Sequence, residues 1–256
     1  MIDPSAKIDP SAKLAPDVRV GPWTIIGPEV VIDAGSVIES HVMIRSHTRI
    51  GKRNHIYQFS SVGEDPSDKK FAGEETWLEI GDDNIIREGC DLHRGTAVGG
   101  GITRIGSRNL LMPYVHVAHD CTVGSDIVMA NYVGISGHVE VADWAIIGGH
   151  TGINQFLKIG AHCMVGGMTH ITNDVPAYMI CSGSPATVRS INAIGLERRG
   201  FSKESIQAIR NAYKIIYLRN LSLQEAIAQI KEMVADCAEL AVLVASLEGS
   251  EKGIHR

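Results

Sequence analysis

Residues 26–44 read IGPEVVIDAGSVIESHVMI, with an aliphatic side chain at every sixth position. The same spacing runs from Ile2 to Val62 and resumes from Ile105 to Ile171. A period of six fits neither an amphipathic helix, which repeats every 3.6 residues, nor a half-buried strand, which repeats every two. It is typical of hexapeptide-repeat solenoids, in which short strands joined by tight turns point one aliphatic side chain per repeat inward.

Three hexads close one triangular coil of such a solenoid. Residues 18 apart in an uninterrupted stretch therefore lie one above the other, about 4.8 Å apart, as strands do in a sheet. The stacked aliphatic side chains supply a continuous core. The same rule places His119 under Gly137, with Gln155 next in that column, and Asp120 under His138.

The repeat is interrupted twice. After Val62 the chain is too polar for inner positions until Ile80, and a shorter glycine-rich break follows Val98. We expect loops to leave the solenoid near residues 64–78 and 98–104. Loops that project from a rigid scaffold are where binding residues tend to lie.

Beyond Pro176 the repeat ends and the pattern becomes helical. Ser202 and Ser222 each precede apolar residues spaced three and four apart, and a third helix is expected near residues 235–247. The predicted fold is mainly β: a left-handed parallel β-helix over residues 1–186, followed by a small C-terminal α-helical bundle over residues 187–256.

Composition restricts the possible surroundings and partners. No segment approaches the ~20 apolar residues of a membrane span, and the N-terminus carries no signal-type apolar run. The net charge of −5 argues against a protein that coats nucleic acid or anionic lipid. Five cysteines, odd in number and without metal-ligand spacing, indicate reduced thiols. We expect a cytoplasmic protein with no membrane span and no nucleic-acid partner.

Four segments carry a family resemblance: residues 56–63 (IYQFSSVG), 92–96 (LHRGT), 116–124 (HVAHDCTVG) and 195–202 (GLERRGFS). They closely resemble the UDP-N-acetylglucosamine 3-O-acyltransferase family, which opens lipid A synthesis in Gram-negative bacteria. The resemblance covers essentially the whole chain. It implies a homotrimer that moves a (3R)-3-hydroxyacyl chain from acyl carrier protein to the 3-position of UDP-N-acetylglucosamine, with no cofactor.

Acyl transfer to a hydroxyl group needs a base for the hydroxyl proton and donors for the developing oxyanion. His119 is the candidate base, because an imidazole titrates near neutral pH. The resemblance implies the same role and assigns the oxyanion to the amide of Gly137. We infer that Asp120 is the partner of a histidine.

The remaining candidate residues concern binding. Guanidinium groups offer forked, permanently charged donors, which suit a diphosphate. The substrate-binding residues, most of them implied by the resemblance, are Asp68, Lys70, His93, His116, His138, Asn154, Gln155, Asn192, Arg198 and Arg199. Positions that the resemblance links to acyl-chain length are Met164, Gly167, Met168 and Pro185.

Three positions depart from the family pattern. Asn154 and Pro185 stand where histidine is common, and Ile194 replaces a residue that is often acidic. An amide can form hydrogen bonds but does not titrate near neutral pH. One hypothesis is therefore an altered acceptor, a 3-amino analogue of the same sugar nucleotide.

Other interpretations stay open. Each histidine alone could lie on a solvated face, and the run from Asp68 to Lys70 could be an ordinary charged loop. The imidazoles of His116, His119 and His138 could together hold zinc, although we expect no metal. A non-catalytic solenoid that binds a sugar nucleotide is the last alternative, but such a protein would have no need for a base at His119.

Overall fold

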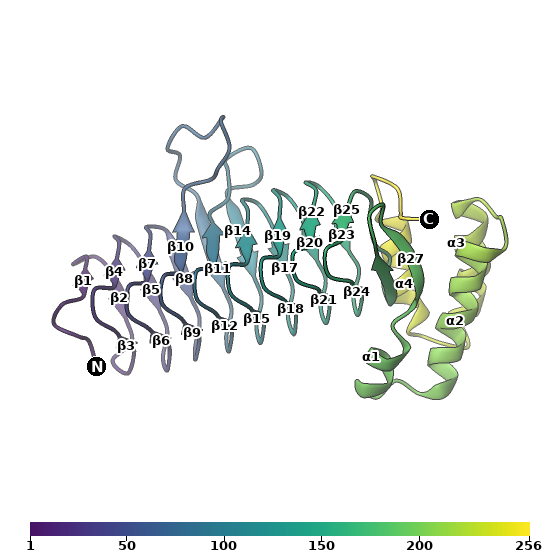
Figure 1. Cartoon of the computed structure of the whole chain (residues 1–256), viewed down its shortest axis with the longest axis horizontal. Coiled ribbons are helices and arrows are strands. Elements are labelled where there is room, and N and C mark those ends of the chain that lie inside the picture. The colour runs from purple at the N-terminus through teal and green to yellow at the C-terminus, as the bar shows by residue number, and fades with distance from the viewer.

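The strands form three sheets that run the length of a solenoid, and each coil contributes one short strand to each sheet (Figure 1). The computed structural model describes residues 1–256. Sheet 1 contains β1 (Lys7–Ile8), β4 (Ile25–Ile26), β7 (Met43–Ile44), β10 (Ser61–Glu64), β13 (Asp91–His93), β16 (His116–Val117), β19 (Gly134–Ile135), β22 (Gly152–Ile153) and β25 (His170–Ile171).

Sheet 2 contains β2 (Lys13–Leu14), β5 (Val31–Ile32), β8 (Thr48–Ile50), β11 (Trp77–Ile80), β14 (Ile102–Ile105), β17 (Thr122–Val123), β20 (Glu140–Val141) and β23 (Lys158–Ile159). Sheet 3 contains β3 (Arg19–Val20), β6 (Val37–Ile38), β9 (His55–Ile56), β12 (Ile85–Ile86), β15 (Leu110–Leu111), β18 (Val128–Met129), β21 (Ile146–Ile147), β24 (Met164–Val165), β26 (Met179–Ser182) and β27 (Thr187–Ile191). All pairs are parallel except the last, β26 with β27.

The repeated aliphatic side chains form the core. Along sheet 1 the inward column is almost completely buried in every coil from the second onward: Ile26, Ile44, Val62, Leu92, Val117, Ile135, Ile153 and Ile171. Burying one such side chain stabilises the fold by about 1.5–3 kcal/mol. The expected mainly β architecture, a parallel β-helix followed by a small helical bundle, is confirmed.

Tight corners connect the sheets, and we name each corner by the two sheets that it joins. At corner 1/2, Asp120, His138 and Phe156 adopt positive φ angles of 60°, 62° and 64°. A non-glycine residue in this left-handed region costs about 1–2 kcal/mol. Stacking between successive coils offsets part of that cost, as between His138 and Phe156, whose ring centroids are 4.4 Å apart.

Both loops expected from the sequence leave the solenoid at corner 1/2, and they rise above the coils in Figure 1. The first occupies residues 65–76, between β10 and β11, and the second occupies residues 94–101, between β13 and β14. The register continues across both, because Val62 pairs with Leu92 and Leu92 pairs with Val117. The loops are insertions into the solenoid that leave its inner column intact.

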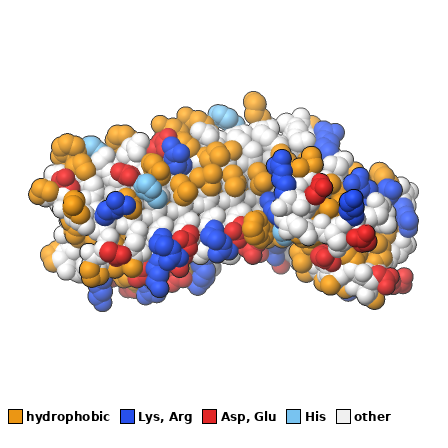
Figure 2. Space-filling view, turned by 90° about the horizontal axis from the view of Figure 1, so that it is seen from below, with side chains coloured by type: hydrophobic (Ala, Val, Ile, Leu, Met, Phe, Trp, Pro, Cys, Tyr) orange, Lys and Arg blue, Asp and Glu red, His pale blue; other side chains and the backbone are white.

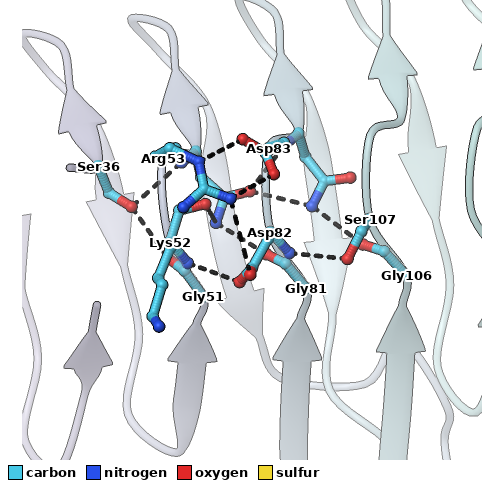
Figure 3. Close-up of polar contacts among 11 residues, drawn as sticks. Ser36, Gly51, Lys52, Arg53, Gly81, Asp82, Asp83, Gly106 and Ser107 are labelled. Atoms are coloured by element: carbon cyan, nitrogen blue, oxygen red, sulfur yellow. Dashed lines mark hydrogen bonds and ion pairs between the residues drawn. The ribbon is translucent and has the colours of Figure 1, made fainter. Parts of the chain in front are cut away.

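Corner 2/3 carries a ladder of polar contacts through the same coils (Figure 3). The Arg53 guanidinium donates through two nitrogens to the carboxylate of Asp83, at 2.6 Å each. Beneath this pair, the side-chain oxygen of Asn54 accepts from the backbone amide of Asn84, and that of Asn84 accepts from the amide of Asn109. This corner therefore continues without interruption where corner 1/2 opens into loops.

The C-terminal part begins with strand rather than helix. The expected boundary between residues 186 and 187 lies in the turn between β26 and β27, so β27 follows it. The helices are α1 (Ala193–Arg198), α2 (Lys203–Leu218), α3 (Leu223–Met233) and α4 (Leu240–Glu248). No helix combines the length and apolarity that crossing a membrane would require.

The helix starts follow their capping residues. The Ser202 and Ser222 hydroxyls accept from backbone amides three residues on, which confirms both expected caps. The third expected helix, α4, begins at Leu240 instead of near Ala235, because residues 234–239 form turns in which the Cys237 thiol hydrogen-bonds to Glu239. Helix α1 was not expected, although Asn192 at its N-cap was a signal for it.

Candidate active site

The site is built around a buried carboxylate at corner 1/2. The Asp120 side chain is fully buried, and its Oδ2 lies 2.8 Å from His119 Nδ1 and 3.5 Å from His138 Nε2. The prediction that residues 18 apart lie one above the other is therefore confirmed here, because Asp120 lies beside His138 of the next coil. Because a carboxylate can only accept, His119 carries a proton on Nδ1 and, when neutral, a lone pair on Nε2.

The second loop completes the surroundings of Asp120. The Thr96 amide donates to Asp120 Oδ1 and the Thr96 hydroxyl donates to Oδ2, each at 2.7 Å. Gly99 lies so close that a Cβ atom there would come within 2.1 Å of the Asp120 carboxyl carbon. Thr96 holds the carboxylate and Gly99 leaves it room; sequence reasoning named the segments that contain them but assigned neither residue a role.

Gly137 leaves space for the His119 ring. A Cβ atom at position 137 would lie 2.6 Å from His119 Cε1 and 2.8 Å from Nε2, so even alanine would displace the imidazole. The Gly137 amide donates no hydrogen bond within the protein. An unused backbone donor thus lies next to the candidate base, as an oxyanion site requires.

A second carboxylate cluster lies on sheet 1. Asp91 Oδ2 is 3.0 Å from His93 Nε2 and 3.0 Å from His116 Nδ1. Asp91 and His116 are partners in the register of β13 with β16, and His93 lies two residues beyond Asp91 on the same face. Sequence reasoning found both histidines but missed Asp91, which the spacing to His93 could have indicated.

The histidines therefore form two groups rather than one. The side chains of Asp91, His93 and His116 are close enough to share a metal ion, and so are those of His119, Asp120 and His138. The three imidazoles considered for zinc do not form one group, because His116 belongs to the first cluster and the other two to the second. In both clusters the carboxylate is already hydrogen-bonded to an imidazole, so neither geometry requires a metal.

Asn154 and Gln155 line an open cavity of about 530 Å³ on the same side of the solenoid. The Asn154 Oδ1 lies 2.9 Å from His170 Nε2, so the amide oxygen is occupied by that imidazole. The other lining residues are Ser136, Leu157, Thr172 and Lys252. Lys252 comes from the C-terminal segment, and its ammonium lies over the Phe156 ring, 5.5 Å from the ring centroid. Sequence reasoning missed Lys252.

The first loop carries Asp68 and Lys70. The Asp68 carboxylate accepts from the Lys70 amide at 3.0 Å, which closes a local turn. The Lys70 side chain is exposed and forms no ion pair. This arrangement leaves the lysine ammonium free to meet an anionic group.

The residues expected to bind nucleotide differ in their freedom. The Asn192 side chain is buried: its oxygen accepts from the Gly195 amide and its nitrogen donates to the His162 carbonyl. Arg199 donates to His162 Nδ1 at 3.2 Å and lies over the Trp144 ring, 5.3 Å from its centroid. Arg198, by contrast, is exposed and unpaired.

His162 is held in its neutral form. Burial and the neighbouring positive charge of Arg199 lower the pKa of His162 to about 4. The neutral Nδ1 can therefore accept from the Arg199 guanidinium at ordinary pH. Arg199 is fixed by the protein itself, and Arg198 is the free guanidinium of the pair.

The residues linked to acyl-chain length lie on other parts of the solenoid. Met164 projects from sheet 3, Gly167 and Met168 lie at corner 3/1, and Pro185 lies in the turn between β26 and β27. All four are exposed. None of them shares the corner that carries His119.

The chain is similar to two family models, to a related protein and to solved structures. Residues 174–255 match the family model described as UDP N-acetylglucosamine O-acyltransferase, domain 2, and residues 102–137 match that for bacterial transferase hexapeptide (six repeats). The chain is 57% identical over 207 residues to the acyl-[acyl-carrier-protein]--UDP-N-acetylglucosamine O-acyltransferase of Saccharophagus degradans, covering 81% of this chain and 80% of the relative.

Solved structures are similar over the whole chain. LpxA from Acinetobacter baumannii is 52% identical, with a TM-score of 0.98, and the match covers 100% of this chain and 99% of that one. The UDP-N-acetylglucosamine O-acyltransferase of Moraxella catarrhalis is 46% identical, with the same TM-score and the same coverage.

Proposed function

The chain belongs to the UDP-N-acetylglucosamine O-acyltransferase family, and we propose that His119 is the general base of its reaction. The enzyme transfers an acyl chain from acyl carrier protein to UDP-N-acetylglucosamine in lipid A synthesis. The single observation that carries the proposal is the hydrogen bond from His119 Nδ1 to the buried Asp120, which leaves the Nε2 lone pair available. We further propose that the donor is a (3R)-3-hydroxyacyl thioester and the acceptor the 3-hydroxyl of the sugar.

In the proposed step, His119 Nε2 takes the proton of the 3-hydroxyl while its oxygen attacks the thioester carbonyl carbon. The Gly137 amide donates to the resulting oxyanion. When the tetrahedral intermediate collapses, the carbon–sulfur bond breaks and the His119 imidazolium returns its proton to the departing thiolate. Asp120 stabilises the imidazolium and fixes its orientation.

The acceptor is the hydroxyl form. The relatives are named as O-acyltransferases, so the comparisons do not favour the 3-amino alternative suggested by Asn154. The Asn154 amide is hydrogen-bonded to His170, which gives it a local structural partner without any change of acceptor. We propose that Asn154 and Gln155 border the sugar, together with His116 and His138.

Binding of the anionic groups follows from which cations are free. We propose that Lys70 and Arg198 contact phosphate, since both side chains are exposed and unpaired, and that Asp68 contributes to the first loop's substrate contacts. Arg199 and Asn192 support the site by holding His162 and the start of α1. We propose that His93 supports substrate binding through its hydrogen bond to Asp91 in the second carboxylate cluster.

We propose that the enzyme is a homotrimer, because one chain separates its candidate base from the residues linked to chain length. His119 lies at corner 1/2, whereas Met164, Gly167 and Met168 lie on sheet 3 and at corner 3/1. A neighbouring subunit could bring the two together. Corner 3/1 and sheet 3 also expose large apolar side chains, including Trp23, Phe59, Ile85, Tyr114 and Tyr132.

Sheet 3 is the face whose strands lie lowest in Figure 1, and Figure 2 views the molecule from that side. Hydrophobic side chains gather along the coils there, above a row of mixed charges at one edge (Figure 2). Contiguous apolar surface on a folded chain marks an interaction site. The mass can be measured by light scattering at micromolar concentration. A mass equal to that of one chain would contradict the proposed trimer.

Two further proposals concern specificity and place. We propose that Met164, Gly167, Met168 and Pro185 border the acyl groove, so a Gly167→Met change should shorten the preferred chain. We also propose that the enzyme works in the cytoplasm, where thiols stay reduced; all five cysteines are unpaired and buried.

The deciding experiment is a thioester assay with UDP-N-acetylglucosamine and acyl carrier proteins bearing chains of several lengths. His119→Ala should lower kcat by about 10²–10⁴-fold, the usual contribution of a general base. Asp83→Asn, at corner 2/3 and away from the proposed subunit interface, is the control and should stay near wild-type activity. If His119→Ala keeps more than about a tenth of wild-type kcat, the assignment of the base is wrong.

A further inference from the structure

We propose that Asp91 is a positioning residue, which holds His93 as an imidazolium and fixes the tautomer of His116. The inference rests on the proposed function, in which His116 borders the sugar. It starts from the strand geometry: residues 91 and 93 of β13 face outward on the same side, and parallel pairing sets His116 beside Asp91. One carboxylate oxygen thus meets an imidazole nitrogen from each strand.

Asp91 is ionised in this cluster. Its burial opposes ionisation and is the largest single influence, but hydrogen bonds and charge from His116 and His93 outweigh it, so the pKa of Asp91 lies well below its usual value. An ionised carboxylate only accepts hydrogen bonds. His93 Nε2 and His116 Nδ1, each 3.0 Å from Asp91 Oδ2, must therefore both carry protons.

The other nitrogen of His93 also carries a proton. His93 Nδ1 lies 2.6 Å from the backbone carbonyl oxygen of Asp65, which can only accept. With a proton on each nitrogen, the His93 ring is an imidazolium. The pKa of His93 agrees: burial would lower it, but the Asp91 carboxylate and the Asp65 carbonyl together raise it.

The imidazolium ties the first loop to sheet 1. Asp65 is the first residue of that loop, and its carboxylate is also paired with the buried guanidinium of Arg94. The loop that carries Asp68 and Lys70 is thus anchored at its base by two cations from β13 and the residue after it. Removing the charge of Asp91 should weaken this anchor as well as release His116.

His116 gains a defined acceptor. With its Nδ1 proton donated to Asp91, the neutral ring carries its lone pair on Nε2, which can accept from a sugar hydroxyl. Without the carboxylate both tautomers become accessible and only one binds the hydroxyl in this way. The expected consequence is weaker binding of UDP-N-acetylglucosamine with little change in the chemical step.

Asp91→Asn should raise the KM for UDP-N-acetylglucosamine about 10–100-fold, the factor expected for a hydrogen bond to a charged group, while kcat changes less than about threefold. Asp83→Asn is the matched control, because Asp83 is paired with Arg53 at the far corner and touches none of these residues (Figure 3). A KM within twofold of wild type for Asp91→Asn would overturn the proposal. If His119→Ala loses activity in the same assay while Asp91→Asn leaves KM unchanged, only the role of Asp91 is wrong and the proposed function still holds.

A double-mutant cycle separates positioning from general damage to the fold. In a His116→Ala background, Asp91→Asn should raise KM by much less than in the wild type, because the histidine through which it acts is gone. Equal increases in both backgrounds would show that Asp91 does not act through His116. His93→Gln, which keeps one donor, is a second probe if Asp91→Asn folds poorly.

The pH profile gives an independent readout. The groups that face His93 are Asp91 on its own strand, Glu64 and the Asp65 carbonyl on the first loop side, and His116 on β16, with Arg94 and Arg45 beyond. In the wild type KM should rise with pH as His93 loses its proton, above the ordinary pKa of a histidine. In Asp91→Asn that rise should move to lower pH; an unmoved profile contradicts the proposal. One tightly bound metal per chain, needed for activity, would also overturn it.

Discussion

The two carboxylate clusters have the same composition, one aspartate between two histidines, but differ in how they are enclosed. Asp120 is fully buried and is held by Thr96 as well as by its histidines. The Asp91 side chain is 43% exposed and is held by two imidazoles alone. A rigid, dry carboxylate such as Asp120 suits proton transfer, whereas a more open one beside the loop, such as Asp91, suits binding.

Asp120→Asn should separate the clusters most strongly. The amide has only one accepting oxygen, so it cannot accept from both the Thr96 amide and His119 Nδ1, and it carries no charge to stabilise the imidazolium. We therefore expect kcat to fall about 10²–10⁴-fold with KM nearly unchanged. Steady-state kinetics beside Asp91→Asn provide the check. If both variants changed KM and spared kcat, the clusters would not have different roles.

Gly99→Ala tests the enclosure of Asp120 without touching either histidine. The new methyl group would overlap the carboxylate, and a displacement near 1 Å can cost about 100-fold in rate. Gly100→Ala is the control in the same loop, since its φ of 98° would be strained but its Cβ would meet nothing. Equal losses in the two variants would point to the loop backbone rather than to the carboxylate.

Thr96→Val should have a smaller effect. It removes the hydroxyl donor to Asp120 Oδ2 and keeps the amide donor to Oδ1. The loss of one such bond, worth about 1–1.5 kcal/mol, predicts a fall in kcat of about 5–10-fold. Wild-type kcat in this variant would mean that the rigidity of Asp120 does not depend on the second loop.

The least pronounced effect concerns stability as a function of pH. Burial opposes the charge of His93, but Asp91 and the Asp65 carbonyl raise its pKa, so the cluster stabilises the fold fully below the unfolded pKa near 6.5. That contribution is lost as pH rises through the higher folded pKa. Thermal unfolding should show wild type and His93→Gln converging in Tm as the pH rises above about 6.5; a constant difference would exclude the imidazolium.

The spacing of aliphatic residues was enough to predict the solenoid and the columns, because a six-residue period admits few other packings. It correctly set Asp120 beside His138 and His119 beside Gly137. It did not place Asp91 beside His116 or Thr96 beside Asp120, since both contacts cross an insertion, where residues that touch are no longer 18 apart. The contacts of Asp120 with Thr96 and of His93 with Asp65 span 24 and 28 residues.

The C-terminal part was predicted only in outline. Two serine caps marked α2 and α3, because a side-chain oxygen that satisfies a free amide is a local signal. The roles of Arg198 and Arg199 could not be separated from sequence, since they depend on Trp144 and His162, which lie far away along the chain. The contacts of an arginine side chain depend on the tertiary structure, which the local sequence does not reveal.

The asparagine ladder of corner 2/3 has a practical consequence for engineering. Successive rungs from Asn54 to Asn84, Asn109 and the amide of Ile127 are separated by 30, 25 and 18 residues, yet each makes the same kind of contact. Corner 2/3 therefore keeps the coils in step whatever length of chain is spliced in at corner 1/2. Foreign peptides could be grafted into the first loop, between Pro66 and Thr76, and the scaffold would still wind in register.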